Sequence, residues 1–124
     1  MKLNPVLSIL LFTVFIVISG CGENKDLNKD VSNIADANCR FMNVMHKLMA
    51  ADPQDSATIA VLQMEEKQCQ EEIQKMNIEF REKYKSQIND RKFKKEYNTE
   101  FRKAILNCPH LSKEDKEMFE KESE

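Results

Sequence analysis

Apolar residues recur every three or four positions through most of the chain beyond residue 26. The first such stripe is apolar at six of its seven positions, which are Leu27, Val31, Ile34, Asn38, Phe41, Met45 and Leu48. This spacing places side chains on one face of an α-helix. The pattern predicts a first helix over residues 27 to 51.

A second stripe continues after a short polar break. Its members are Ile59, Leu62, Glu66, Cys69, Ile73, Met76, Phe80 and Tyr84. The break reads Asp52-Pro53-Gln54-Asp55, in which Asp52 can cap a helix and Pro53 suits the first helical position. We therefore expect a long second helix over residues 53 to 88.

Two further helices are expected before the C-terminus. Asn89-Asp90 is a plausible interruption, with Asp90 as the next cap, although one continuous helix through it is the alternative. The third stripe holds Phe93, Tyr97, Phe101, Ala104 and Cys108, and Pro109 stops it. Ser112 with Asp115 three residues later resembles a capping box and predicts a short fourth helix.

The two glycines are Gly20 and Gly22, so residues 23 to 124 contain none. This composition disfavours β-hairpins and tight turns. Short connections force neighbouring helices to run antiparallel. We expect an all-α fold in which an antiparallel helical hairpin is extended to a three-helix bundle with a short C-terminal helix, all in one domain over residues 27 to 124. A long coiled-coil oligomer is the competing architecture.

The N-terminal segment has the features of an export signal. Met1 and Lys2 precede an apolar run over residues 6 to 18, interrupted only by Ser8 and Thr13. Thirteen helical residues reach roughly 20 Å, which is too short for a hydrocarbon layer of roughly 30 Å. The run is typical of a cleaved signal peptide.

The run ends in Ile18-Ser19-Gly20-Cys21, which resembles the lipobox of bacterial lipoproteins. The resemblance covers residues 1 to 21 and implies a signal peptide over 1 to 20, cleavage between Gly20 and Cys21, and acylation of Cys21, followed by a tether up to residue 26. Two or three acyl chains anchor a protein stably, at about 0.8 kcal/mol per buried CH₂. Gly22 at the next position favours the outer membrane over the inner membrane. A secretory signal cut elsewhere is the alternative.

Three cysteines follow Cys21, and export would expose them to an oxidising compartment. Measured along the expected helices, Cys39, Cys69 and Cys108 lie at similar levels. We favour a structural disulfide between Cys39 and Cys108, because Cys108 ends its helix and can adjust whereas Cys69 lies at the centre of its stripe. No Cys-x-x-Cys motif suggests a thiol-redox enzyme.

The charge balance differs along the chain. The expected mature chain carries 18 Lys and Arg against 21 Asp and Glu, which excludes a nucleic-acid partner on charge grounds. Residues 81 to 103 carry nine basic side chains against four acidic ones, interleaved with aromatic residues. For an exported protein this pattern suggests anionic lipid head groups, lipopolysaccharide phosphates or cell-wall polymers. A solvated face beside a buried aromatic stripe is the simpler interpretation.

One motif suggests metal chemistry. Met42, Met45, His46 and Met49 share a helical face, and thioethers with an imidazole suit Cu(I). The motif resembles the Met/His pairs of periplasmic copper- and silver-binding proteins, although the simpler interpretation is core packing by adaptable methionines. Cys108-Pro109-His110 could offer zinc two ligands, but no further pair stands at a suitable spacing.

No phosphate loop, nucleophile elbow or metalloprotease motif occurs, so we expect no enzyme and no cofactor. The sequence favours a lipid-anchored envelope lipoprotein whose small helical module binds a protein partner or an envelope polymer near the membrane. The alternatives are a periplasmic protein that binds Cu(I) or Ag(I), and a self-assembling coiled-coil lipoprotein.

Overall fold

The computed structural model describes residues 25–121, which form four helices and no strand. The helices are α2 (Lys25–Ala50), α3 (Ser56–Lys83), α4 (Arg91–Leu106) and α5 (Lys113–Lys121). The prediction of an all-helical fold is confirmed. No helix within residues 25–121 has both the length and the apolar character needed to cross a membrane.

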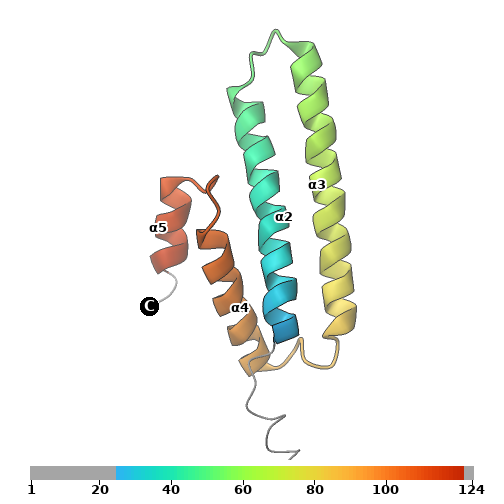
Figure 1. The fold of residues 1–124 in the computed structure, drawn as a ribbon, viewed down its shortest axis with the longest axis vertical. Coiled ribbons are helices and arrows are strands. Elements are labelled where there is room, and N and C mark those ends of the chain that lie inside the picture. The colour runs from blue at the N-terminus through green and yellow to red at the C-terminus, as the bar shows by residue number, and fades with distance from the viewer. Residues whose placement is uncertain (1–24, 122–124) are drawn as a thin grey trace, which may run out of the picture.

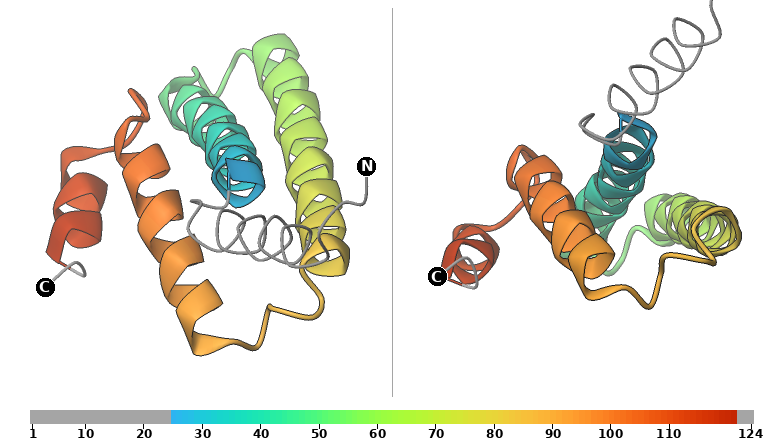
Figure 2. Two further views of the ribbon diagram at one scale, coloured as in Figure 1. Left: turned by 60° about the horizontal axis from the view of Figure 1, so that its bottom comes forward. Right: turned by 90° about the horizontal axis from the view of Figure 1, so that it is seen from below.

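Helix α2 packs against both α3 and α4, whereas α3 and α4 have no close backbone approach along their lengths. Figure 1 shows α2 between the other two, with consecutive long helices running in opposite directions and α5 beside α4. Seen from below, α2, α3 and α4 lie at the corners of a triangle (Figure 2). Helices α3 and α4 therefore flank an open side of the bundle.

The two ends of this bundle differ. The basal end is where α2 begins, α3 ends and α4 begins, at the bottom of Figure 1. The distal arm is the part of α2 and α3 that extends beyond the end of α4 in Figure 1, namely the residues of α2 that follow Met42 and the first half of α3, which lies beside them. Because α4 ends at Leu106, the distal arm consists of two helices only.

Side-chain caps fix two helix starts where the sequence predicts them. The backbone N–H of Phe93 donates to Asp90 Oδ1 at 2.9 Å at the start of α4. At the start of α5, Asp115 N donates to Ser112 Oγ at 3.0 Å and the same hydroxyl donates to the Asp115 carboxylate at 2.7 Å. Both contacts satisfy donors that the first helical turn leaves unpaired.

The predicted bounds of the second helix are wrong at both ends. Asp52 accepts from Gln54 N at 2.9 Å within a turn, and the cap is Asp55, which accepts from Thr58 N at 3.0 Å. Asp55 is the better cap because its carboxylate also accepts from the Thr58 hydroxyl. At the other end α3 stops at Lys83, and residues 84 to 89 form turns.

The first helix begins earlier than expected. Helix α2 (Lys25–Ala50) already includes Lys25, the first described residue, so the last two residues of the predicted tether, Lys25 and Asp26, are helical. Asp26 lies in the first turn, where a carboxylate stabilises the helix dipole. Lys25 is four positions after Cys21 in the sequence.

The core consists of two clusters in the basal half. In the first, Leu27 and Val31 of α2 pack with Tyr84 and Phe93, and Phe80, Tyr97 and Phe101 border them. In the second, Ala35 of α2 packs with Ile105, Cys108 and Leu111, and Met42 and Phe119 lie against them. In both clusters residues of α2 pack against residues of α4 or of the segment that follows it. Helix α4 and that segment are therefore attached to the fold mainly by their packing on α2.

Candidate functional site

The residues predicted for signal cleavage and acylation, Gly20 and Cys21, lie outside the described residues. The predicted disulfide is present, since Cys39 of α2 is bonded to Cys108 with Cα atoms 5.6 Å apart. Cys108 lies just beyond α4 rather than on it, and is buried in the second cluster. Because its thiol is used in this bond, Cys108 cannot serve as a zinc thiolate next to His110.

A polar junction closes the basal end. Asp30 of α2 accepts from Lys83 Nζ at 2.6 Å and from the Tyr84 hydroxyl at 2.9 Å. Tyr84 is itself buried against Phe80 and Phe93, with ring centroids 4.6 and 5.2 Å away. The junction therefore fixes the end of α3 to the start of α2, directly above the loop that leads to α4.

The charges of this junction reinforce one another. Partial burial acts to raise the pKa of Asp30, but hydrogen bonds from Lys83 and Tyr84 and the charges of Lys83 and Lys29 outweigh it, so the pKa falls below 3.8. The hydrogen bond to Asp30 raises the pKa of Lys83. Burial, and then the Asp30 contact, raise the pKa of Tyr84. At neutral pH the junction is a carboxylate held by an ammonium and a neutral phenol, which is a structural arrangement.

A groove runs along the open side of the bundle between α3 and α4. The upper part of the groove lies between α3 and α2, and the lower part lies between α3 and α4. Asn77 and Arg81 of α3 line both parts. The remaining lining residues are Asn38, Phe41, Gln70, Ile73, Gln74, Ile78, Phe80, Ile88, Phe93, Lys94, Tyr97 and Asn98. At the lower end Phe80 and Tyr97 meet with ring centroids 5.2 Å apart. The surface is thus apolar at its base and amide-rich along its edges.

The groove has a charge bias that the other side of the α2–α3 pair lacks. Its lining contains two cations, Arg81 and Lys94, and no carboxylate. The hollow on the opposite side of α2 and α3 contains Asp30 and Glu79 beside Lys83. Arg40 also binds Glu72 at 2.8 Å and joins α2 to α3. The open groove therefore favours an apolar ligand with negative charge at its margins.

The four residues of the metal motif have different surroundings. Met42 packs against the second cluster, Met45 is half-buried, and His46 is exposed. Met49 is 72% exposed. Met45, His46 and Met49 thus stand on the part of α2 beyond the end of α4, where α3 is the one neighbouring helix among the described residues.

Other candidate groups do not gather into a site. No group of three or more His, Cys, Asp or Glu side chains in residues 25–121 is placed to hold a metal ion. Cys69 on α3 is a half-buried free thiol, as the predicted pairing leaves it.

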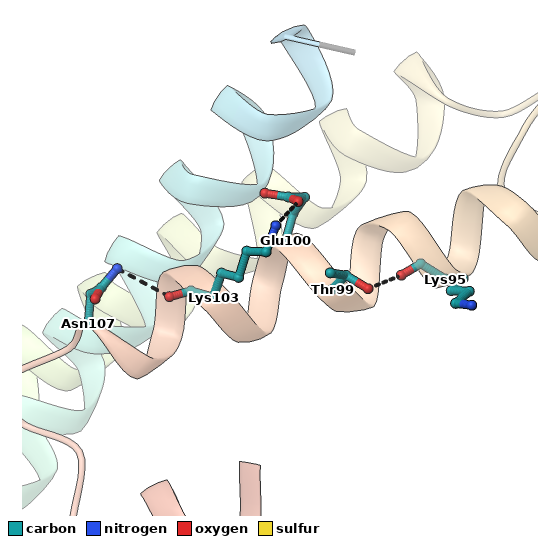
Figure 3. A network of polar contacts seen from close by, with 5 residues as sticks. All are labelled: Lys95, Thr99, Glu100, Lys103 and Asn107. Carbon is teal, nitrogen blue, oxygen red and sulfur yellow. Dashed lines mark hydrogen bonds and ion pairs between the residues drawn. The ribbon is translucent and has the colours of Figure 1, made fainter. Parts of the chain in front are cut away.

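The outer face of α4 shows how the basic stretch is divided (Figure 3). Lys103 pairs with Glu100 at 2.9 Å, and Asn107 donates to the Lys103 carbonyl at 3.2 Å. Lower on the helix the Thr99 hydroxyl donates to the Lys95 carbonyl at 2.8 Å, while the Lys95 side chain points away from this network. The cations near the start of α4 are thus separated from the partly neutralised ones near its end.

Sequence reasoning missed both the Asp30 junction and the groove. Asp30 lies outside the apolar stripe, and only the pairing register of α2 with α3 brings it to Lys83 and Tyr84. Counting outward from the Asp52–Asp55 turn places Tyr84 seven residues further from the turn than Asp30, about 10 Å along a helix, so counting alone did not indicate this contact. The groove depends on the separation of α3 from α4, which stripe patterns do not encode.

Comparisons with known proteins add no further constraint, since no family model, curated protein or solved structure matches this chain.

Proposed function

We propose that this chain is a lipid-anchored envelope lipoprotein, acylated at Cys21, whose helical bundle binds a partner protein near the membrane. The groove between α3 and α4 is the contact surface, and its occupant is an amphipathic helix with acidic residues beside its apolar face. The observation that carries the proposal is the lining of this groove, which is apolar and aromatic with two cations and no carboxylate.

A helix suits the geometry better than an extended peptide. Helices α2, α3 and α4 occupy three corners of a bundle, and the open corner between α3 and α4 is where the fourth helix of a four-helix bundle lies. An amphipathic helix buries its apolar face in such a groove through anchors spaced three and four residues apart. Arg81 and Lys94 would then meet its acidic flanks and fix its register.

Site-specific photocrosslinking in intact envelopes tests the proposal. A photoreactive residue at Asn77, in the groove, should capture a peptide from another protein that has an acidic amphipathic pattern. The matched position is Lys67, which is exposed elsewhere on α3. Arg81→Glu should reduce capture at Asn77 about tenfold or more. Capture of this chain by itself, or equal capture at both positions, would contradict the proposal.

A soft-metal function is the second candidate, favoured by the exposure of His46 and Met49 on α2 beside the half-buried Met45. Two thioethers and an imidazole are ligands that Cu(I) accepts. Cu(I) kept reduced with ascorbate should bind one ion per chain after the Cys69 thiol has been blocked, and Met45→Leu with Met49→Leu should abolish it. Binding weaker than micromolar in the unsubstituted chain would remove this candidate.

A further inference from the structure

The basal end carries a charge opposite to that of the rest of the molecule. Residues 25–31 and 82–96, which meet there, contain eight basic and five acidic side chains. The remainder of the chain from residue 21 onward contains 10 basic and 16 acidic side chains. The fold thus gathers a positive end onto a protein that is acidic elsewhere.

Several acidic side chains at this end are already engaged. Asp30 is held by Lys83 and Tyr84, and Asp90 caps α4. With Lys83 engaged, seven cations of this end are exposed and take part in no ion pair within residues 25–121; they are Lys25, Lys29, Lys85, Arg91, Lys92, Lys94 and Lys95. Their charge is therefore available to a ligand outside the chain.

We propose that this basal end binds the anionic phosphate head groups of a phospholipid surface through Lys85, Arg91, Lys92 and Lys95. The inference rests on the proposed function in one respect: acylation of Cys21 would set which end of the bundle faces the membrane. Lys25, at the basal end, lies four positions after Cys21. Four residues span at most about 14 Å. An acyl chain on Cys21 would therefore keep the basal end near the lipid surface. Head-group charge acts over about 8 Å at physiological salt, so these cations would lie close to the range of that attraction.

The opposite end is shaped to point away from such a surface. Helix α2 has 26 residues and is thus about 39 Å long. The turn at its far end carries Asp52 and Asp55, both exposed, and an anionic surface repels them. Attraction at one end and repulsion at the other would stand α2 and α3 away from the membrane and leave the groove accessible from the side.

Vesicle flotation tests this binding without the acyl anchor. The chain from residue 21 onward, carrying Cys21→Ser, keeps every described residue, and its helical circular dichroism spectrum confirms that it is folded. It should float with vesicles containing about a third phosphatidylglycerol and stay behind with pure phosphatidylcholine. Raising the salt to about 0.5 M should release it, because head-group attraction is screened within a few Å.

Two variants of equal net charge locate the surface. Lys85→Gln, Arg91→Gln, Lys92→Gln and Lys95→Gln together should weaken binding on the order of a hundredfold, since each cation near the surface contributes. The matched variant removes four exposed lysines away from the basal end: Lys47→Gln, Lys67→Gln, Lys75→Gln and Lys121→Gln. It should bind as the parent does.

Three results would overturn the inference. One is absence of phosphatidylglycerol-dependent flotation in the folded parent chain. Another is equal loss in both variants, which would indicate attraction without a defined surface. The third is displacement by 10 mM inorganic phosphate at constant ionic strength, which would indicate a discrete phosphate site. None of these depends on acylation of Cys21 or on a helix in the groove, so failure here is distinguishable from failure of the proposed function.

Discussion

Helices α2 and α3 have different surroundings in the two parts of the molecule. In the basal half α4 also lies beside α2, whereas in the distal arm it does not. Near the basal end α2 has neighbours on two sides, and Leu27 and Val31 are fully buried. In the distal arm α2 has only α3 beside it, and Val44 and Leu62 are the buried apolar residues of that part. Met49 and Met64 there remain 72% and 64% exposed. The apolar stripe continues along α2, but burial falls once α4 ends.

This difference indicates where the stability of the fold resides. Apolar burial stabilises a fold roughly in proportion to the area removed from water, so most of the stability of this chain resides in the basal half. A segment with few buried contacts opens locally more easily than the rest. The distal arm is therefore expected to open more easily than the basal half, which holds the Asp30 junction, the disulfide and the start of α4.

The largest expected effect comes from removing the covalent link in the basal half. Cys39→Ala with Cys108→Ala opens a loop of 69 residues in sequence separation, which should lower the free energy of unfolding by about 4 kcal/mol. Urea denaturation followed by circular dichroism measures the change. Cys69→Ala, which removes the half-buried free thiol, should cost less than about 1 kcal/mol. Equal losses would mean that the disulfide is not what holds α4 to α2.

Core truncations probe the two halves directly. Ile105→Ala removes a fully buried side chain of the second cluster and should cost about 3 to 4 kcal/mol. Leu62→Ala lies in the distal arm, where a two-helix core can collapse around the lost atoms, and should cost about 1 to 2 kcal/mol. The comparison is by urea denaturation at matched conditions. A larger loss of stability for Leu62→Ala than for Ile105→Ala would contradict the conclusion that most of the stability resides in the basal half.

The Asp30 junction gives a smaller effect with a defined pH dependence. Asp30→Asn should cost about 1 kcal/mol at pH 7, since the side chain is partly exposed. The pKa of Asp30 is lowered in the folded state, so its contribution is present above the unfolded value of about 3.9 and is lost as the pH falls through the folded value. The free energies of unfolding of variant and parent should therefore converge as the pH falls through the folded-state pKa of Asp30. A difference that stays constant from pH 7 to pH 3 would exclude the carboxylate as its source.

The smallest effect is expected at the exposed methionine of α3. Met64→Gln should change the free energy of unfolding by less than about 0.5 kcal/mol, because the side chain is already 64% exposed. Thermal denaturation gives the value. A loss above 1 kcal/mol would show that the distal arm is packed against something, such as a second copy of the chain.

The sequence sufficed where a local signal determines the structure. Ser112 with Asp115 and Asp90 before Phe93 predicted two helix starts, because a cap needs only its own first turn. Helix lengths and turn positions placed all three cysteines at similar levels, and the pairing of Cys39 with Cys108 was chosen because Cys108 ends its predicted helix whereas Cys69 lies at the centre of its stripe. Asp52-Pro53 misled because Asp55 competes as a cap and gains a second hydrogen bond from Thr58.

The sequence did not predict the features that depend on how whole helices pack against one another. The groove exists because α3 and α4 both pack on α2 and not closely on each other, a choice set by the sum of many side-chain contacts. The positive basal end likewise needs α2, α3 and α4 to meet, since Lys29 and Lys92 are far apart in sequence. Periodicity identifies which face of a helix is apolar but not which neighbour covers it.

Acylation of Cys21 is the claim on which the orientation of the molecule depends. Metabolic labelling with an alkyne fatty acid, followed by mass spectrometry of the purified chain, tests it most directly. The account predicts a labelled, membrane-associated product that begins at Cys21, and loss of the label in Cys21→Ser. An unlabelled chain that retains residues 1 to 20 would contradict it.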